Sequence, residues 1–399
     1  MLKDLNDVVR LEHLLSCQIV LFFVSEPDNN FANKELARIN PKLILDGKYP
    51  RLINEWQEEP AIWNAVRWEV DWKNQNGLFI LTGSSTPKYK GVLHSGAGRI
   101  VKVRMETMSL YESKESSGII SLKDLCNQKI QEQLVEPLTF EQLAYLIVRD
   151  GWHKNIQTST VQCHLLPNSY IETILNESIK EIDNFKYSPL KVKLILKSLE
   201  RNEATLVSEA TIIKDISTND NQKISRPTVN KYINVLNRMS IFNNQEPFSL
   251  DLRSSSRIRI AEKKRFCDPS LVCALLNITI DKLISDVKLY GILFESLVIR
   301  DLRVYAQAIQ EKLFHYRDYD NNELDAVLEL NSDDWCAIEI KLSSTQVDNA
   351  VKNLNKAVDK VIQNNKKPPI LKCVIVGLGN AIYKRKEGIV IVPINTLKD

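Results

Sequence analysis

The sequence lacks the features that are typical of secreted proteins, membrane proteins and proteins with a structural zinc site. Its seven cysteines are scattered along 399 residues and form no CxxC pair, which favours reduced, mostly buried thiols. No apolar run approaches the ~18 residues of a membrane span. Acidic Asp4, Asp7 and Glu12 precede the apolar run at 19–24, where a signal peptide requires positive charge. We therefore expect a cytoplasmic protein without a membrane partner.

A strong charge of either sign is also missing. The formal net charge is +3, so no whole-molecule basic field attracts nucleic acid, and any basic surface must be local. Hydrophobic residues make up 44% of the chain, which is enough for several buried cores and argues against disorder. At about 100–200 residues per domain, the length allows two to four domains.

The first region, residues 1–113, alternates apolar runs with a helical pattern. The runs at 19–24, 51–55 and 77–85 have the composition of buried strands, and residues 60–72 carry apolar side chains near helical spacing. Strands that alternate with helices predict a parallel, doubly wound sheet. We expect a multi-domain α/β protein that begins with this sheet.

Residues 114–186 form the second region, which is helical and charged. Thr139 is placed to cap a helix that ends at Asp150 and Gly151. No pattern of chemically active residues stands out in this region. It predicts a helical lid or linker domain.

The third region, residues 187–260, resembles a helix-turn-helix or winged helix. Ser225 is a good N-cap, and Pro227 fits the first helical turn. The helix that follows has a polar face that could enter a major groove. Because that face carries only two positive charges, Lys231 and Arg238, packing or protein contact is favoured over DNA binding. The opposite, apolar face consists of Val229, Tyr232, Ile233 and Leu236.

The last region, residues 261–399, has the pattern of a mixed α/β domain. Its apolar runs predict strands at 324–330, 335–342, 370–376 and 388–392. Helical patterns at 281–309 and 345–363 surround them.

Two of these strands carry carboxylates and a lysine. Period two places Glu339 and Lys341 on one face of their strand. Asp325 lies on the partner strand and faces the same side if the loop gives an odd register. Glu295, on the preceding helix, is the candidate for a further carboxylate. This D…ExK arrangement resembles that of restriction-endonuclease-like folds.

The resemblance implies a metal-dependent site that acts on DNA. Asp325, Glu339 and Glu295 are candidate ligands of a divalent cation, Mg²⁺ by preference. Lys341 would orient or activate the attacking water and balance charge. The alternative is a cross-strand ion pair, in which Lys341 only neutralises Asp325 and Glu339.

The sequence carries only parts of a nucleotide site. A P-loop needs GxxxxGK[ST], and these 399 residues contain no such motif. Asn54 and Glu55 end a strand where a Walker B motif has a metal-binding Asp and a water-orienting Glu. Thr82 and Ser84 end the next strand in the place of polar sensors, and Arg99 follows a loop as a trans-acting arginine would. Without a phosphate cradle, the simpler interpretation is a strand-end carboxylate and a solvated loop arginine.

Four sequence runs, residues 50–57, 79–84, 94–100 and 108–113, together resemble one family. It is the family of prokaryotic AAA-like ATPases with a C-terminal restriction-endonuclease-like domain of unknown function. The resemblance covers nearly the whole chain. In that family the Walker B run usually reads LIDEWQ, whereas this sequence has Asn54 in place of the Asp. The family also has a Walker A loop before a strand like that at 19–24. This sequence begins just after the place where that loop would lie. The sequence DGWH at 150–153 also departs from the family's GGWP.

Two independent losses therefore predict an ATPase-deficient unit, and we do not expect ATP to be a cofactor of this chain. A mis-assigned start site would explain the missing loop but not Asn54. We expect a nucleic-acid-associated or defence-type protein with a nuclease-like C-terminal domain. Two alternatives stay open. One is an active ATP-binding protein whose P-loop is missing from this sequence, and the other is a non-catalytic protein that binds a protein partner or a second copy of itself.

Overall fold

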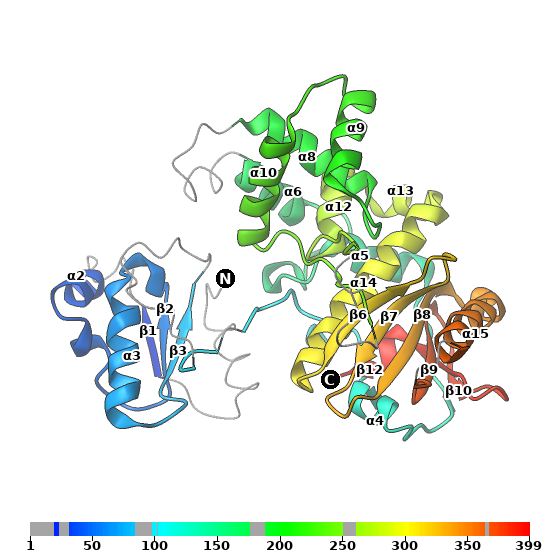
Figure 1. The fold of residues 1–399 in the computed structure, drawn as a ribbon, viewed down its shortest axis with the longest axis horizontal. Helices are drawn as coiled ribbons and strands as arrows, with labels where there is room; N and C mark the ends of the chain where they lie inside the picture. Colours follow the sequence, from blue (N-terminus) through cyan, green and yellow to red (C-terminus); the bar gives the residue numbers. More distant parts are fainter. Residues whose placement is uncertain are drawn as a thin grey trace. The chain divides into compact units, whose positions relative to one another are not determined.

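The computed structural model describes residues 20–23, 32–83, 98–101, 103–175, 188–249, 261–363 and 367–399. The chain forms two compact units. We call them the N-terminal unit (Met1–Met105 with Arg238–Ser240) and the C-terminal unit (Glu106–Asn237 with Ile241–Asp399). Figure 1 labels their helices and strands. The first expected region falls mainly in the N-terminal unit, and the other three fall mainly in the C-terminal unit.

The N-terminal unit contains a parallel sheet of order β1-β2-β3. Its strands are β1 (Val20–Phe23), β2 (Arg51–Asn54) and β3 (Phe79–Thr82). Two helices, α2 (Ala32–Ile39) and α3 (Ala61–Lys73), connect successive strands. This alternation confirms the parallel arrangement that the apolar runs predict. Short 3-10 turns lie at η2 (Pro41–Ile44) and η3 (Trp56–Glu58).

The apolar core of this unit lies between β2 and the helices. Ile53 of β2 packs with Ile62, Trp63 and Val66, which recur at helical spacing along α3. Trp56 completes the contact, with its ring centroid 4.9 Å from that of Trp63. The single apolar face of α3 thus fixes the helix to the sheet, as its sequence pattern indicates.

Eight α-helices lie in the described part of residues 122–285. Thr139 begins α5 with a capping box, because its hydroxyl accepts from the Gln142 N–H and the Gln142 side chain accepts from the Thr139 N–H. Asp150 ends this helix with a positive φ of 82°, so the expected cap and stop are both confirmed. The helices are α4 (Leu122–Cys126), α5 (Phe140–Arg149), α6 (Leu165–Thr173), α8 (Pro189–Arg201), α9 (Glu209–Asn219), α10 (Arg226–Arg238), α12 (Pro269–Leu276) and α13 (Ile280–Ser285).

Helix α10 occupies the expected place after Ser225. Val229, Tyr232 and Leu236 of its apolar face are buried, and Val235 replaces the half-buried Ile233 in the core. Two stretches after the helix, residues 241–248 and 261–267, form antiparallel bridges with each other through Phe242–Phe266 and Gln245–Lys263. We call these two stretches the bridged pair. Thr205 extends the bridging through Lys264.

A seven-stranded mixed sheet lies in the described part of the C-terminal unit, in the order β5-β10-β11-β9-β8-β7-β6. Strands β6, β7 and β8 form an antiparallel meander, and β9 and β11 continue the sheet in parallel with β8. A separate two-stranded sheet pairs β4 (Ile120–Ser121) with β12 (Leu397–Lys398). The strands of the large sheet are β5 (Gln133–Leu134), β6 (Lys312–Arg317), β7 (Glu323–Glu329), β8 (Trp335–Ser343), β9 (Leu371–Leu378), β10 (Ala381–Lys384) and β11 (Val390–Pro393).

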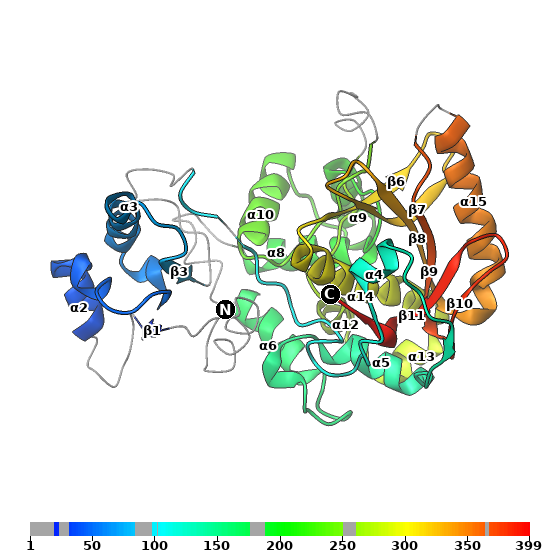
Figure 2. The same cartoon turned by 90° about the horizontal axis from the view of Figure 1, so that it is seen from below.

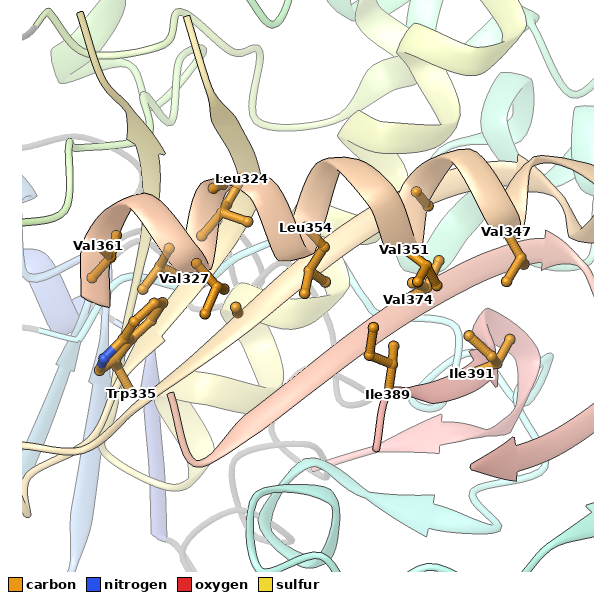
Figure 3. Close-up of a cluster of buried hydrophobic side chains, with 14 of the residues drawn as sticks. Leu324, Val327, Trp335, Val347, Val351, Leu354, Val361, Val374, Ile389 and Ile391 are labelled. Carbon is orange, nitrogen blue, oxygen red and sulfur yellow. The ribbon is translucent and has the colours of Figure 1, made fainter. Parts of the chain in front are cut away.

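Helices α14 (Val287–Ala308) and α15 (Val347–Gln363) cover opposite faces of this sheet, as Figures 1 and 2 show. Figure 3 shows the apolar side chains of α15 above Trp335 of β8 and Val374 of β9. On the other face, a Cβ added at Gly377 of β9 would meet the ring of Phe294 from α14. Both faces of the central strands are therefore buried, which explains their nearly continuous apolar sequence.

Four strands expected in this region are confirmed within two residues of their predicted ends. The expected helix at 281–309 is wrong in one respect, because it is two helices, α13 and α14. Asp286 separates them with non-helical φ and ψ, and its carboxylate accepts from the Leu289 N–H at 3.0 Å to begin α14. Strands β6, β10 and β12 of this region were not predicted.

Among the helices that the structure describes, none combines the length and the apolar character that a membrane crossing needs. Six cysteines lie within the described residues, and all six are buried free thiols. The remaining cysteine, Cys17, lies outside the described residues.

Candidate functional site

Asp325 of β7 and Glu339 of β8 face each other across the antiparallel pair. The register pairs Ala326 with Ile338, and one further step places Asp325 opposite Glu339. Asp325 is only 9% exposed and Glu339 is only 3% exposed. The predicted register, with both carboxylates on one face, is confirmed.

Lys341 joins the two carboxylates from the same strand as Glu339. Its Nζ lies 2.8 Å from Glu339 Oε2 and 3.3 Å from Asp325 Oδ2. The backbone N–H of Ile340 also donates to Asp325 Oδ2 at 2.8 Å. Strand β8 therefore fixes the position of Asp325 through both its main chain and its lysine.

The electrostatics of this cluster follow from burial next to an apolar face. Glu339 and Lys341 share a strand face with Trp335 and Ala337, which pack under α15. Burial raises the pKa of Glu339 to about 9, with a further rise from Asp325 and an opposing effect of Lys341. Burial also acts to lower the pKa of Lys341, but the two carboxylates outweigh it and raise that pKa above its usual value. One lysine thus leaves the two carboxylates only partly compensated.

Glu295 does not lie with Asp325 and Glu339, although the sequence predicts all three as ligands of one cation. It extends from α14 and pairs with Arg265, while Lys263 Nζ lies 3.5 Å from its Oε1. The reason is geometric, because α14 covers the sheet face opposite to the one that carries Glu339 and Lys341. Within the residues that the structure describes, no three or more His, Cys, Asp or Glu side chains gather closely enough to hold a metal ion.

A buried polar network links this region to the bridged pair. Arg265 donates from Nε to Gln245 Oε1 at 3.0 Å, and Gln245 Nε2 donates to the Asp325 main-chain oxygen at 2.9 Å. Arg265 Nη1 also donates to Ser296 Oγ at 3.0 Å, and Ser296 Oγ donates to Glu203 Oε1 at 2.7 Å. The main chain at Asp325 is thus held by side chains that are distant in sequence.

Sequence reasoning missed Lys263 and Arg265, although the run Glu262-Lys263-Lys264-Arg265-Phe266 contains a usable signal. In an extended stretch, side chains alternate between two sides. Lys263 and Arg265 are buried, whereas Lys264 is partly exposed and pairs with Glu262. Alternation of like charges beside a predicted acidic strand could have identified the two buried cations.

Glu203 makes the stability of this network dependent on pH. Burial raises the pKa of Glu203 to about 7 from 4.5, although Arg265 opposes the rise. Because the pKa of Glu203 is higher in the folded chain than in the unfolded chain, protonation of Glu203 favours the folded state. Its contribution to the free energy of unfolding is therefore full below about pH 4.5 and is lost as pH rises to about 7. At roughly 1.4 kcal/mol per pKa unit, the loss is about 3 kcal/mol.

We therefore expect Glu203→Gln to make the decline shallower by about this amount, while Glu339, whose pKa is also raised, keeps its own part of the pH dependence. Chemical denaturation between pH 4.5 and pH 8 would measure the free energy of unfolding of both proteins. Glu262→Gln, at a partly exposed neighbour of the network, should keep the wild-type slope. An unchanged slope in Glu203→Gln would show that another group causes the pH dependence.

The residues of the expected nucleotide site lie in the N-terminal unit. The register pairs Asn54 with Thr82, and Thr82 Oγ1 donates to the buried Asn54 Oδ1 at 2.9 Å. Glu55 follows with a left-handed φ of 55° and accepts from Gln57. Arg99 pairs with Asp71 of α3, and Ser84 lies outside the described residues. The structure therefore brings Asn54 and Thr82 together, whereas Arg99 forms its ion pair with Asp71.

Two sequence-family profiles match parts of the chain. A domain of unknown function, DUF8612, matches residues 141–282, and another domain of unknown function, DUF4143, matches residues 290–397. The two matches meet near Asp286, where α13 gives way to α14. No curated protein matches the chain. The carboxylate cluster lies in the second matched region, and the buried cations of the bridged pair lie in the first.

Proposed function

We propose that the C-terminal part of the chain is a restriction-endonuclease-like domain whose Asp325, Glu339 and Lys341 form a metal-dependent site for cleaving nucleic-acid phosphodiesters. One observation carries the proposal. Two buried carboxylates face each other across neighbouring strands, and a single lysine contacts both. A structural ion pair needs only one carboxylate for one lysine, whereas a cation site needs the excess negative charge.

The order of elements supports this fold. Helix α14 precedes the antiparallel meander β6-β7-β8, and α15 then crosses over to the parallel strand β9. The acidic residues lie on the second and third strands of this set. This is the placement that the D…ExK resemblance implies.

The side chains present fit a hard divalent cation. Mg²⁺ is commonly held by one or two carboxylates with several waters, and Asp325 and Glu339 offer that pair without Glu295. A bound cation would polarise the phosphodiester and lower the pKa of water. Asp325, fixed by the Ile340 N–H, would keep its position as a ligand. Lys341, which the two carboxylates keep as an ammonium group, would orient the attacking water by hydrogen bonding and balance the negative charge of the site.

The test is cleavage of linear DNA and of RNA by the full chain with Mg²⁺ or Mn²⁺. We expect products only with the metal, and none after chelation. Glu339→Gln should lose cleavage because it removes one ligand charge. Absence of cleavage on both nucleic acids would reject the nuclease assignment.

For the N-terminal unit, we propose an AAA-like sheet that does not hydrolyse ATP. DUF4143 is commonly seen in AAA-ATPase-associated proteins, which supports the ancestry. Asn54 stands at the end of β2 without a charge, and its oxygen already accepts from Thr82. Its contribution to Mg²⁺ binding is therefore weak.

We expect no ATP turnover by the full chain, with or without DNA, in a phosphate-release assay. Glu55→Gln is the matched variant, since Glu55 is the residue that would orient water. The two proteins should give the same background signal. Turnover by wild type that disappears in Glu55→Gln would restore an active ATPase.

A winged helix is proposed for the segment from α8 to the bridged pair. Three helices followed by an antiparallel bridged pair support it. Arg226 on α10 pairs with Glu209 of α9, which reduces the positive charge offered to a nucleic acid. We assign this segment to packing and protein contact.

A further inference from the structure

Two thiols from distant parts of the sequence meet inside the C-terminal unit. Cys126 ends α4 and Cys336 lies on β8, 210 positions later, yet their sulfur atoms are 3.6 Å apart. Trp335 and Ala337 pack under α15, so Cys336 between them faces the other side of the sheet, where it meets Cys126. A disulfide holds its sulfur atoms about 2.0 Å apart, so these two must approach by about 1.6 Å.

The two thiols differ in their access to solvent and in their protonation. Cys126 is 7% exposed, whereas Cys336 is 0% exposed. Asp124 and Gln128, which flank Cys126 in the sequence, line a surface hollow beside α4. The Cys336 S–H donates to the Cys126 sulfur, which favours the thiolate at Cys126, the form that reacts with an oxidant. That hydrogen bond and burial together raise the pKa of Cys336, so Cys126 is the thiol that a small oxidant attacks first.

Cys373 is a third buried thiol in this part of the core. It lies on β9 opposite Ile338 of β8, so it faces the same side of the sheet as Cys336. Burial raises its pKa, and Cys126 adds to the rise. The sulfur atoms that the structure places in contact are nevertheless those of Cys126 and Cys336, which makes Cys373 the natural control.

We propose that Cys126 and Cys336 form a reversible disulfide when the folded chain meets a hydroperoxide. The Cys126 thiolate attacks one peroxide oxygen, the O–O bond breaks, and Cys126 becomes a sulfenic acid while hydroxide leaves and takes up the proton that Cys126 gave up. The Cys336 sulfur then displaces the sulfenic hydroxyl group, which leaves as water with the Cys336 proton. The two thiols lose two electrons, and one hydrogen peroxide becomes two waters. An external thiol reverses the bond by exchange.

The disulfide would tie α4 covalently to β8. Cys126 precedes both matched regions, residues 141–282 and 290–397, and Cys336 lies in the second. The bond would therefore join the segment before the matched domains to the central sheet. It does not depend on the proposed nuclease activity, because it needs only the two thiols and a peroxide.

The experiment is oxidation of the folded full chain with hydrogen peroxide, followed by alkylation of the remaining thiols, digestion and peptide mapping by mass spectrometry. Wild type should yield the Cys126–Cys336 peptide pair, and dithiothreitol should remove it. Cys126→Ala and Cys336→Ala should both lose the pair, whereas Cys373→Ala, the matched control, should keep it. Dimedone, which captures sulfenic acids, should label Cys126 in Cys336→Ala and should not label Cys336 in Cys126→Ala.

The wild-type peptide map decides the proposal even if an alanine variant does not fold. A folded chain that keeps both thiols reduced in peroxide, or that pairs either of them with Cys373 or another cysteine, would overturn it. Appearance of the pair only after unfolding in urea would also overturn it, because chance encounter in the unfolded chain would then form the bond. Dimedone labelling of Cys336 in place of Cys126 would contradict the order of the two steps.

Discussion

Replacement of Lys341 by methionine is expected to reduce nucleic-acid cleavage by about 10²–10³-fold, the usual contribution of one positioned hydrogen-bond donor that stabilises developing charge. Methionine keeps the length and packing of the side chain, but it carries no charge and has no N–H group that could donate a hydrogen bond to the attacking water. Metal binding should remain, because Asp325 and Glu339 are both intact and have lost a competing cation. The measurement is cleavage rate with saturating Mn²⁺, alongside Mn²⁺ affinity.

Lys372→Met provides the matched control for this prediction. Lys372 lies on the neighbouring strand β9 and bonds to Asn355, outside the carboxylate cluster. Its cleavage rate should match wild type. Normal cleavage by Lys341→Met would reduce Lys341 to a structural counter-ion, and loss of metal binding would show that the lysine builds the site instead of acting in it.

Trp335→Ala is expected to lower the free energy of unfolding of the C-terminal unit by about 3–5 kcal/mol. Trp335 is 1% exposed and packs against Phe248, with ring centroids 5.4 Å apart. Its Nε1 also donates to the Lys367 main-chain oxygen at 2.9 Å. The variant loses apolar contact under α15 and leaves that oxygen without its partner.

Urea denaturation measures this loss. Tyr319→Ala is the control, because Tyr319 is an aromatic residue of the same unit that is 84% exposed, and its effect should stay within about 0.5 kcal/mol. A loss below about 1 kcal/mol in Trp335→Ala would mean that the α15 face contributes little to stability.

The strands of the candidate site were predictable because their signals are local. Residues 335–342 alternate apolar side chains with Glu339 and Lys341, and this period places both polar groups on one face. The short loop after Glu329 then fixes the register that brings Asp325 opposite Glu339. Both steps require only neighbouring residues, and the structure agrees with them.

Tertiary placement was less accessible from the sequence. Glu295 lies on a helix whose position relative to the sheet depends on packing between α14 and β9, and no local pattern specifies that face. Lys263 and Arg265 reach Glu295 from about 30 residues earlier, through the bridged pair. Strand β6 was missed because His315 and Arg317 interrupt its apolar pattern.

Mn²⁺-dependent stabilisation of the full chain tests the central claim most directly, compared between wild type and Asp325→Asn. A ligand at 100 times its Kd stabilises the folded state by about 2.7 kcal/mol when it does not bind the unfolded chain. Asp325→Asn keeps the shape of the side chain and removes one ligand charge. The account predicts that Mn²⁺ raises the unfolding midpoint of wild type and raises that of Asp325→Asn much less. Equal shifts in the two proteins would contradict it, because the effect of Mn²⁺ would then be general screening of surface charge.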